Sequence, residues 1–205
     1  MLAPNDNTVN IKKPYHHGDL QSALVSCGMD LLKTEKPESL SLRQIARKTG
    51  VSPTAVYRHF PDKAALLRAL AARGFEMLGE MQSAAARQAA AGGAITPFAA
   101  SGAAYVRFAL ANPAIFRLMF TSAPPKNLFD IPLQNLSGPM RMLRDNITTI
   151  SPNPASDQQQ KILAIRAWSL VHGLAVLALD RMIPLDDSLL AAIITGAITP
   201  KPPPP

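Results

Sequence analysis

The sequence predicts an all-α fold, with a small N-terminal helical domain followed by a larger helical one. Apolar residues recur at spacings of three and four along most of the chain, and no segment is convincing as a strand. Helix-starting pairs such as Ser52-Pro53 and helix-ending glycines such as Gly50 stand at the ends of these apolar series. With 205 residues, 47% of them hydrophobic, the chain is long enough to bury a sizeable core.

Four helices are predicted in the N-terminal part of the chain. Each has an amphipathic series, and the residue before each series, Asp19, Ser41, Ser52 or Asp62, is of a type that commonly caps a helix N-terminus. Pro53 fits the first helical position, where no backbone N–H is needed. We expect helices from Asp19 to about Thr34, from Leu42 to just before Gly50, from Pro53 to about His59, and from Lys63 to about Ala90.

The rest of the chain, after a break at Gly92-Gly93, is again helical in period. Asn112-Pro113 combines a cap with a first-turn proline, so a new helix is expected to begin there. Proline-containing segments at 124–125 and 151–154 are expected loops, and residues 201–205 form a proline tail. The predicted helices cover residues 97–111, 112–121, 128–150, 157–182 and 186–198.

The net charge of +7 is concentrated towards the N-terminus. Residues 1–75 contain eleven Lys and Arg against six Asp and Glu, whereas residues 76–205 contain ten against eight. This distribution is typical of a module that faces nucleic acid, although a solvated basic face has the same composition. Residues 1–15 are polar and irregular, and we expect them to form a flexible basic arm.

The composition disfavours disulfide-rich, metal-binding, catalytic and membrane proteins. One cysteine and four histidines cannot build a disulfide framework or a Cys-based metal site, and Cys27 is expected to be a buried structural thiol. No metalloprotease, phosphate-loop or catalytic-triad pattern is present, so we expect no catalytic residue, no metal and no cofactor. The apolar runs are far shorter than the roughly 18 residues of a membrane span, which predicts a cytoplasmic protein with no membrane partner.

Residues 50–60, GVSPTAVYRHF, predict a helix with two different sides. At about 100° per residue, Val56 and Phe60 fall on an inward side, whereas Thr54, Tyr57 and Arg58 fall outward. Two short helices joined by a glycine-containing turn, with a third helix packed across them, match the helix-turn-helix arrangement. The outward hydroxyl, phenol and guanidinium can bind base edges and phosphates in a major groove, so DNA binding is favoured over a merely exposed polar face.

Phosphate binding is also predicted at the helix N-termini. The caps at Ser41, Ser52 and Asp62 mark three places where backbone N–H groups and the positive end of a helix dipole can meet an anion. Lys63, just inside the fourth helix, is expected to contact a phosphate of the DNA backbone.

Residues 40–70, LSLRQIARKTGVSPTAVYRHFPDKAALLRAL, resemble the DNA-binding signature of the TetR family of bacterial transcriptional regulators. The match extends back over HHGDLQSALVSCGMDLL, and its clearest departure is Thr49, where alanine or leucine is frequent. The resemblance implies an all-helical homodimer in which three N-terminal helices bind DNA and the following helices sense a ligand and dimerise. Positions that commonly touch DNA in this family are occupied by Ser41, Arg43, Ser52, Thr54, Ala55, Tyr57, His59 and Lys63, with Arg43 and Thr54 where bases are often read.

The resemblance also implies the domain organisation. Residues 16–75 are expected to form the helix-turn-helix DNA-binding domain, and residues 76–200 the helical ligand-binding and dimerisation domain. The last two helices, within 157–198, are expected to form the dimer interface. This expectation rests chiefly on the resemblance, because an aliphatic stripe along a helix is more often part of the core. AWSLVHGLAVLAL and ANPAIFRLMF together resemble a C-terminal subgroup named for its Trp-His-Gly motif, a label that supplies no ligand.

The Trp-His-Gly motif has two interpretations. Trp168 and His172 are four residues apart and therefore lie on one helix face. In the first interpretation they pack in the core or across the dimer, and Gly173 allows a close helix approach. In the second they line an apolar pocket for a hydrophobic effector. The residues assigned to that pocket are Tyr105, Phe108, Phe116, Met119, Met140, Leu143, Trp168 and His172.

Two hypotheses of function follow from these patterns. The first is a repressor that binds a pseudo-palindromic operator in double-stranded DNA as a homodimer and is released by a small apolar effector. The second is a DNA-bound structural or protein-interaction factor with no small-molecule switch. A cavity of several hundred Å³ in the second domain would favour the first hypothesis, and a filled core would favour the second.

Overall fold

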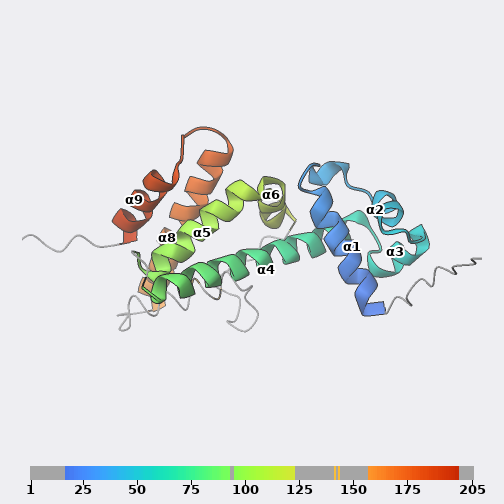
Figure 1. Cartoon of the computed structure of the whole chain (residues 1–205), viewed down its shortest axis with the longest axis horizontal. Helices are drawn as coiled ribbons and strands as arrows, with labels where there is room; N and C mark the ends of the chain where they lie inside the picture. Colours follow the sequence, from blue (N-terminus) through green and yellow to red (C-terminus); the bar gives the residue numbers. More distant parts are fainter. Residues whose placement is uncertain (1–16, 93–94, 123–140, 142, 144–156, 199–205) are drawn as a thin grey trace, which may run out of the picture.

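The computed structural model describes residues 17–92, 95–122, 141, 143 and 157–198. Within these ranges every regular element is helical, which confirms the predicted fold class (Figure 1). The helices are α1 (His17–Leu31), η1 (Pro37–Ser39, a short 3-10 turn), α2 (Leu42–Thr49), α3 (Pro53–His59), α4 (Lys63–Ala90), α5 (Pro97–Ala111), α6 (Pro113–Thr121), α8 (Asp157–Leu179) and α9 (Asp187–Ile198).

The long helix α4 connects two groups of helices. Helices α1, α2 and α3 lie at one end of the molecule, and α5, α8 and α9 lie towards the other, with α6 between them against α4 (Figure 1). Because α4 is continuous from Lys63 to Ala90, it crosses the domain boundary that the sequence suggested near residue 75. A movement of one helix group can therefore be transmitted to the other through a single rigid element.

A continuous hydrophobic core runs from the three-helix end into the larger group. At the N-terminal end it contains Leu24, Ile45 and Val56, which are fully buried, and further along α4 it includes Phe116 and Met119 of α6. The α4–α6 contact is close at Gly74, where a Cβ atom would lie 2.8 Å from Ile115 and 2.9 Å from Met119. A second core cluster lies between α5, α8 and α9.

Several helix boundaries differ from the predicted ones. Helix α1 runs from His17 to Leu31, so Asp19 lies in its first turn rather than at its cap. An acidic residue is favoured in the first turn as well as at the cap, so the sequence alone does not distinguish the two. Helix α8 ends at Leu179 rather than at residue 182, and Arg181 adopts a left-handed conformation with φ 58° just after it. The predicted helix over 128–150 lies outside the described residues except for positions 141 and 143, which are helical.

Asn112 does not cap α6 through its side chain, contrary to the sequence interpretation. Its Nδ2 donates a hydrogen bond to the Phe108 carbonyl at 3.1 Å, so the side chain serves the C-terminal end of α5. The last carbonyls of a helix lack backbone partners, and a nearby amide group satisfies one of them. The Asn112-Pro113 pair still ends one helix and begins the next.

Helix α8 is more apolar than the sequence interpretation allowed. Residues Gln158–Leu179 are long and apolar enough to cross a membrane by length and composition, although only 22% of this apolar stretch is buried inside this chain. The sequence interpretation considered only uninterrupted apolar runs. It therefore missed the overall apolar character of this helix, in which a few polar residues separate the apolar ones. A helix with these properties is also typical of a contact surface between protein chains.

Candidate functional site

The turn between α2 and α3 is built as the sequence predicts. Ser41 caps α2 by accepting a hydrogen bond from the Gln44 N–H at 3.1 Å, and Gly50 ends it with φ 70°, a left-handed conformation that glycine adopts without strain. Ser52 then caps α3 by accepting from the Ala55 N–H at 3.2 Å. Gly50 and Ser52 thus end α2 and begin α3, and the two helices lie beside each other at one end of the molecule (Figure 1).

Helix α3 has the two sides that its sequence predicted. Val56 and the adjoining Phe60 are buried, with 0% and 3% of their surfaces exposed. Thr54, Tyr57 and Arg58 are exposed, and Tyr57 exposes 47% of its surface although it is a large aromatic residue. An exposed tyrosine beside an arginine on a short capped helix presents groups that can bind phosphates and base edges in a major groove.

The other predicted DNA-contact residues surround α3. Ser41, Arg43 and Ser52 are exposed, whereas Ala55, His59 and Lys63 are half-buried. The ammonium of Lys63 donates a hydrogen bond to the Glu38 carbonyl in η1. Lys63 therefore holds η1 to the start of α4, and an ammonium group with three donors has two others with which to reach a phosphate.

An aromatic cluster lies where α5, α6 and α8 meet. It consists of Tyr105 on α5, Phe116 and Phe120 on α6, and Trp168 and His172 on α8, with ring centroids between 4.7 Å and 6.3 Å apart in the contacting pairs. Phe75 of α4 joins it through an edge contact with Phe120 at 5.6 Å. The cluster thus contains side chains from four helices.

A chain of hydrogen bonds crosses this cluster. The Trp168 Nε1–H donates to the Tyr105 hydroxyl at 3.3 Å, and the Tyr105 hydroxyl lies 2.9 Å from His172 Nδ1. Burial raises the pKa of the Tyr105 hydroxyl, the hydrogen bond from Trp168 opposing it, so this hydroxyl keeps its proton. Burial also lowers the pKa of His172 below its ordinary value, which favours the neutral ring. Since indole can only donate, the Tyr105 proton is directed to Nδ1, and the remaining His172 proton is assigned to Nε2.

The predicted pocket residues fall into three groups. Tyr105, Phe108, Phe116 and Met119 are buried in the core, with no more than 2% of their surfaces exposed. Trp168, His172 and Leu143 are half-buried, and Met140 lies outside the described residues. Six of the eight belong to the aromatic cluster or to the hydrophobic core around it, namely Tyr105, Phe108, Phe116, Met119, Trp168 and His172.

Gly173 does not allow a close helix approach within the described part of this chain, because a Cβ atom at this position would meet no atom within 4 Å. The helix that approaches α8 closely is α5, at Gly102, where a Cβ atom would lie 3.3 Å from Val171. Spacing along one helix does not reveal which face the neighbouring helix covers. An approach at Gly173 across the dimer stays a prediction.

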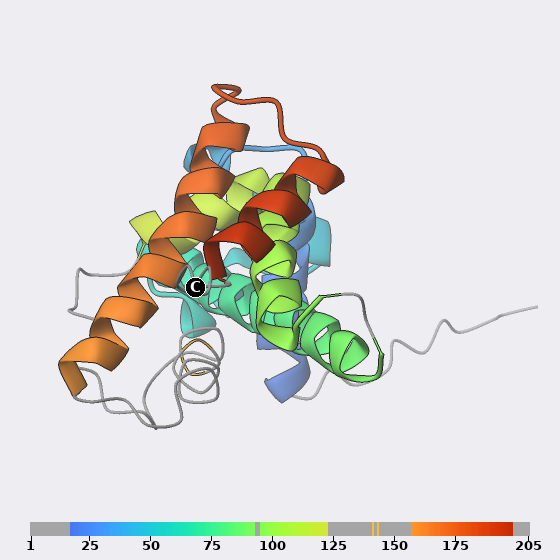
Figure 2. The ribbon, with the colours of Figure 1, turned by 90° about the vertical axis from the view of Figure 1, so that its left-hand side faces the viewer.

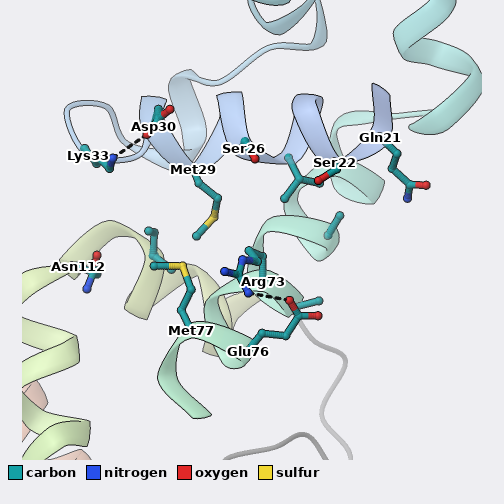
Figure 3. A pocket seen from close by; sticks show the side chains of 14 residues that line it. Gln21, Ser22, Ser26, Met29, Asp30, Lys33, Arg73, Glu76, Met77 and Asn112 are labelled. Atoms are coloured by element: carbon teal, nitrogen blue, oxygen red, sulfur yellow. Dashed lines mark hydrogen bonds and ion pairs between the residues drawn. The ribbon is translucent and has the colours of Figure 1, made fainter. Parts of the chain in front are cut away.

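An open groove of about 610 Å³ lies between α1 and α4, at the junction of the two helix groups (Figure 3). Met29 and Met77 face each other across it, and Arg73 forms ion pairs with Glu76 at 3.1 Å and Glu80 at 2.9 Å. None of the residues of the aromatic cluster and none of the predicted pocket residues lines this groove.

Comparisons with known proteins agree with both halves of this arrangement. The sequence model of bacterial regulatory proteins of the tetR family matches residues 25–70, and that of the tetracyclin repressor-like C-terminal domain matches residues 98–197. The chain belongs to the TetR family. It is thus a transcription regulator with a helix-turn-helix DNA-binding domain, and not an enzyme.

Two solved structures are similar to this TetR family member along most of its length. A protein of unknown function from Rhodococcus sp. RHA1 is 31% identical, with a TM-score of 0.67, over 91% of this chain and 95% of that one. A candidate regulatory protein, SCO4313, is 21% identical, with a TM-score of 0.60, over 89% of this chain and 96% of that one. The similarity to SCO4313 shows a shared fold. The Trp-His-Gly subgroup stays a prediction, because the C-terminal match is described more broadly.

Sequence reasoning missed three residues of the regulatory end of this TetR protein. Phe75 and Phe120 complete the aromatic cluster, and Gln82 is a polar residue buried between α4 and α5. The signal for Gln82 was present, since it falls seven residues after Phe75 and four after Leu78, on the inward face of α4. A polar residue at an apolar position of a helical period is a reason to look for a partner.

Proposed function

We propose that this TetR family regulator is a repressor that binds a pseudo-palindromic operator as a homodimer and is released by a small apolar effector. The proposal includes DNA contacts by the residues at and around α3: Ser41, Arg43, Ser52, Thr54, Ala55, Tyr57, Arg58, His59 and Lys63. It also includes a cytoplasmic location, as expected of a regulator that acts on chromosomal DNA.

The exposed face of α3 is the observation that supports DNA binding most directly. Thr54, Tyr57 and Arg58 are exposed together on a helix whose start is set by a cap and whose opposite side is anchored in the core. Such a helix can enter the major groove as a rigid body without a loss of side-chain packing. The N-termini of α2, α3 and α4 add backbone N–H groups for phosphates.

The apolar surface of α8 and α9 supports the homodimer. Ile162, Ile165, Leu177 and Leu189 each expose between 39% and 46% of their surfaces. The two helices lie together at the end of the molecule away from α1–α3 (Figures 1 and 2). Pairing of these helices with their two-fold mates would bury this surface in a four-helix interface and leave two α3 helices free to reach successive major grooves.

The two functional hypotheses differ at the aromatic cluster. The half-buried positions of Trp168 and His172 support an effector site, since both side chains keep part of their surface exposed in the single chain. The complete burial of Tyr105, Phe108, Phe116 and Met119 supports the alternative, a DNA-bound structural or protein-interaction factor with no small-molecule switch. We favour the first, because a polar hydrogen-bond chain in an apolar core is a feature of ligand sites.

The DNA-binding part is tested by selection from a random duplex library with the full-length protein. The expected product is a pseudo-palindrome whose half-sites are separated by about one helical turn, 10–10.5 base pairs, or a multiple of it. Fluorescence anisotropy with the selected duplex then gives the affinity and its salt dependence. Enrichment of no sequence, with binding equally tight to any duplex, would contradict an operator-specific regulator.

A further inference from the structure

Gln82 is a buried amide with only one of its two polar atoms in a hydrogen bond. It exposes 8% of its surface, and its Nε2 donates to the Ser101 carbonyl of α5 at 3.3 Å. The other atom, Oε1, is buried, and no group in the described chain donates to it. The orientation of the amide follows from its partner, because a carbonyl can only accept and so requires the NH₂ group.

A buried acceptor without a donor is unfavourable, so native cores rarely contain one. Replacement of Gln82 by an apolar residue of similar size would avoid the problem, because the surroundings on α4 are apolar, with Leu78 buried four residues earlier. An unpaired amide oxygen at such a position is therefore a reason to expect a donor that the chain itself does not supply.

The hydrogen-bond partner of Gln82 lies one helical turn from the hydrogen-bond chain of the aromatic cluster. This partner, Ser101, and the cluster residue Tyr105 are four residues apart on α5 and thus share a face, about 6 Å apart along the axis. His172 completes the chain with Nδ1 on the Tyr105 hydroxyl. The unpaired acceptor Gln82 Oε1 therefore lies beside the face of α5 that carries the polar group of the cluster.

We propose that the effector is an uncharged molecule with an apolar, largely aromatic body and one hydroxyl or N–H group that donates to Gln82 Oε1. This inference rests on the proposed effector site, which it makes more specific. An ether or hydrocarbon of the same shape leaves the buried Oε1 unpaired and binds less tightly. A carboxylate brings an uncompensated charge into this apolar core, and it is rejected.

The test compares two probe pairs that differ only in the donor: phenol with anisole, and thymol with thymol methyl ether. Trp168 is the only tryptophan of the chain, so its fluorescence reports binding near the cluster directly. The full-length wild type is expected to bind each phenol at least about tenfold more tightly than its methyl ether. In Gln82→Met, which keeps the side-chain length and removes the acceptor, the preference is expected to fall to about twofold or less.

Gln88→Met is the matched control, since Gln88 is an exposed glutamine on the same helix and its replacement should leave the preference unchanged. Circular dichroism checks that both variants are folded. If Gln82→Met does not fold, the preference of the wild type for a phenol over its ether still decides the proposal. Equal binding of a phenol and its ether by the wild type, no binding of either, or an unchanged preference in a folded Gln82→Met would each overturn the proposal.

Operator binding, measured in parallel with the selected duplex, separates this inference from the proposed function. If both probes release DNA equally well, the donor requirement is wrong but effector control stands. If the phenols bind preferentially through Gln82 and DNA remains bound, the donor requirement is supported and release by this ligand class is contradicted.

Discussion

His172 is the residue whose protonation should have the largest effect on the regulatory end. Burial lowers the pKa of His172 in the folded state below its ordinary value, so the folded protein binds this proton less readily than the unfolded chain does. The contribution of His172 to stability is therefore fully present above the unfolded pKa of about 6.5 and is lost as the pH falls below it.

We predict that His172→Gln reduces the pH dependence of stability. Glutamine keeps an acceptor for the Tyr105 hydroxyl and does not titrate, so the loss of unfolding free energy between about pH 7.5 and about pH 5.5 should be smaller than in the wild type. Urea unfolding at the two pH values measures the difference. His59→Gln, at a half-buried position on the DNA-binding end, is the control. An identical pH dependence in His172→Gln and wild type would mean that the His172 ring is effectively solvated.

Lys63 is the residue at which a structural and a DNA-binding role coincide. Its ammonium holds the Glu38 carbonyl, and the same group is proposed to contact a phosphate. We predict that Lys63→Ala weakens binding to the selected operator and reduces the salt slope by about one, because one fewer counterion is released. Anisotropy titrations over a range of salt concentrations give the slope.

The control for Lys63 is Lys33→Ala, in the turn that follows α1. Lys33 is exposed and paired with Asp30 at 2.6 Å, outside the predicted contact set, so its replacement should leave the slope unchanged. If Lys63→Ala lowers thermal stability but leaves the salt slope as in the wild type, its role is the attachment of η1 alone.

At the scale of elements, the close contact of α4 and α6 depends on the absence of a side chain at Gly74. A Cβ atom there would lie 2.8 Å from Ile115 and 2.9 Å from Met119, closer than such atoms normally approach. Alanine would force α6 away from α4 or push both side chains into less favourable rotamers. The contact therefore fixes the position of α6 between the two helix groups.

We predict that Gly74→Ala destabilises the protein by about 1–2 kcal/mol, since overpacking outweighs the gain in helix propensity. Gly173→Ala is the matched control, because a Cβ atom there meets nothing within 4 Å and the propensity gain alone should stabilise by up to about 1 kcal/mol. Urea unfolding of both variants measures the pair. If both glycines respond alike, the α4–α6 contact is looser than the distances indicate.

At the scale of the whole molecule, the exposed apolar surface of α8 and α9 is expected to hold two chains together. We predict that Ile165→Lys, at a position 46% exposed in the single chain, shifts the protein from dimer to monomer. A lysine there would place a charge inside an apolar interface. Light scattering coupled to gel filtration measures the oligomeric state. Leu110→Lys, at a position 39% exposed on α5, is the control and should leave the dimer intact.

The dimer prediction also connects to DNA binding. A monomer can dock one α3 helix but loses the second half-site, so Ile165→Lys should bind the selected operator much more weakly than Leu110→Lys does. A dimeric Ile165→Lys protein with wild-type affinity would place the interface elsewhere.

Much of the N-terminal end could be predicted from sequence, for local physical reasons. Ser41, Ser52 and Asp62 each cap the helix that follows them, and a cap interacts with backbone groups only three residues away. The inward position of Val56 and the outward position of Tyr57 follow from helical period within one short element. These features depend on residues that are close together in the chain, so they can be predicted without knowledge of the tertiary contacts.

The tertiary structure decided what depends on residues far apart in the chain. Tyr105 and His172 are 67 positions apart, and only the packing of α5 against α8 brings the hydroxyl to Nδ1. The same is true of Gln82 beside Ser101, and of Gly74, where α4 and α6 approach each other closely. The helical period predicts which residues share a face. Which other helix packs against that face depends on the packing of the whole core. The DNA-binding helix was thus determined locally by its own sequence, and the regulatory core by the packing of four helices.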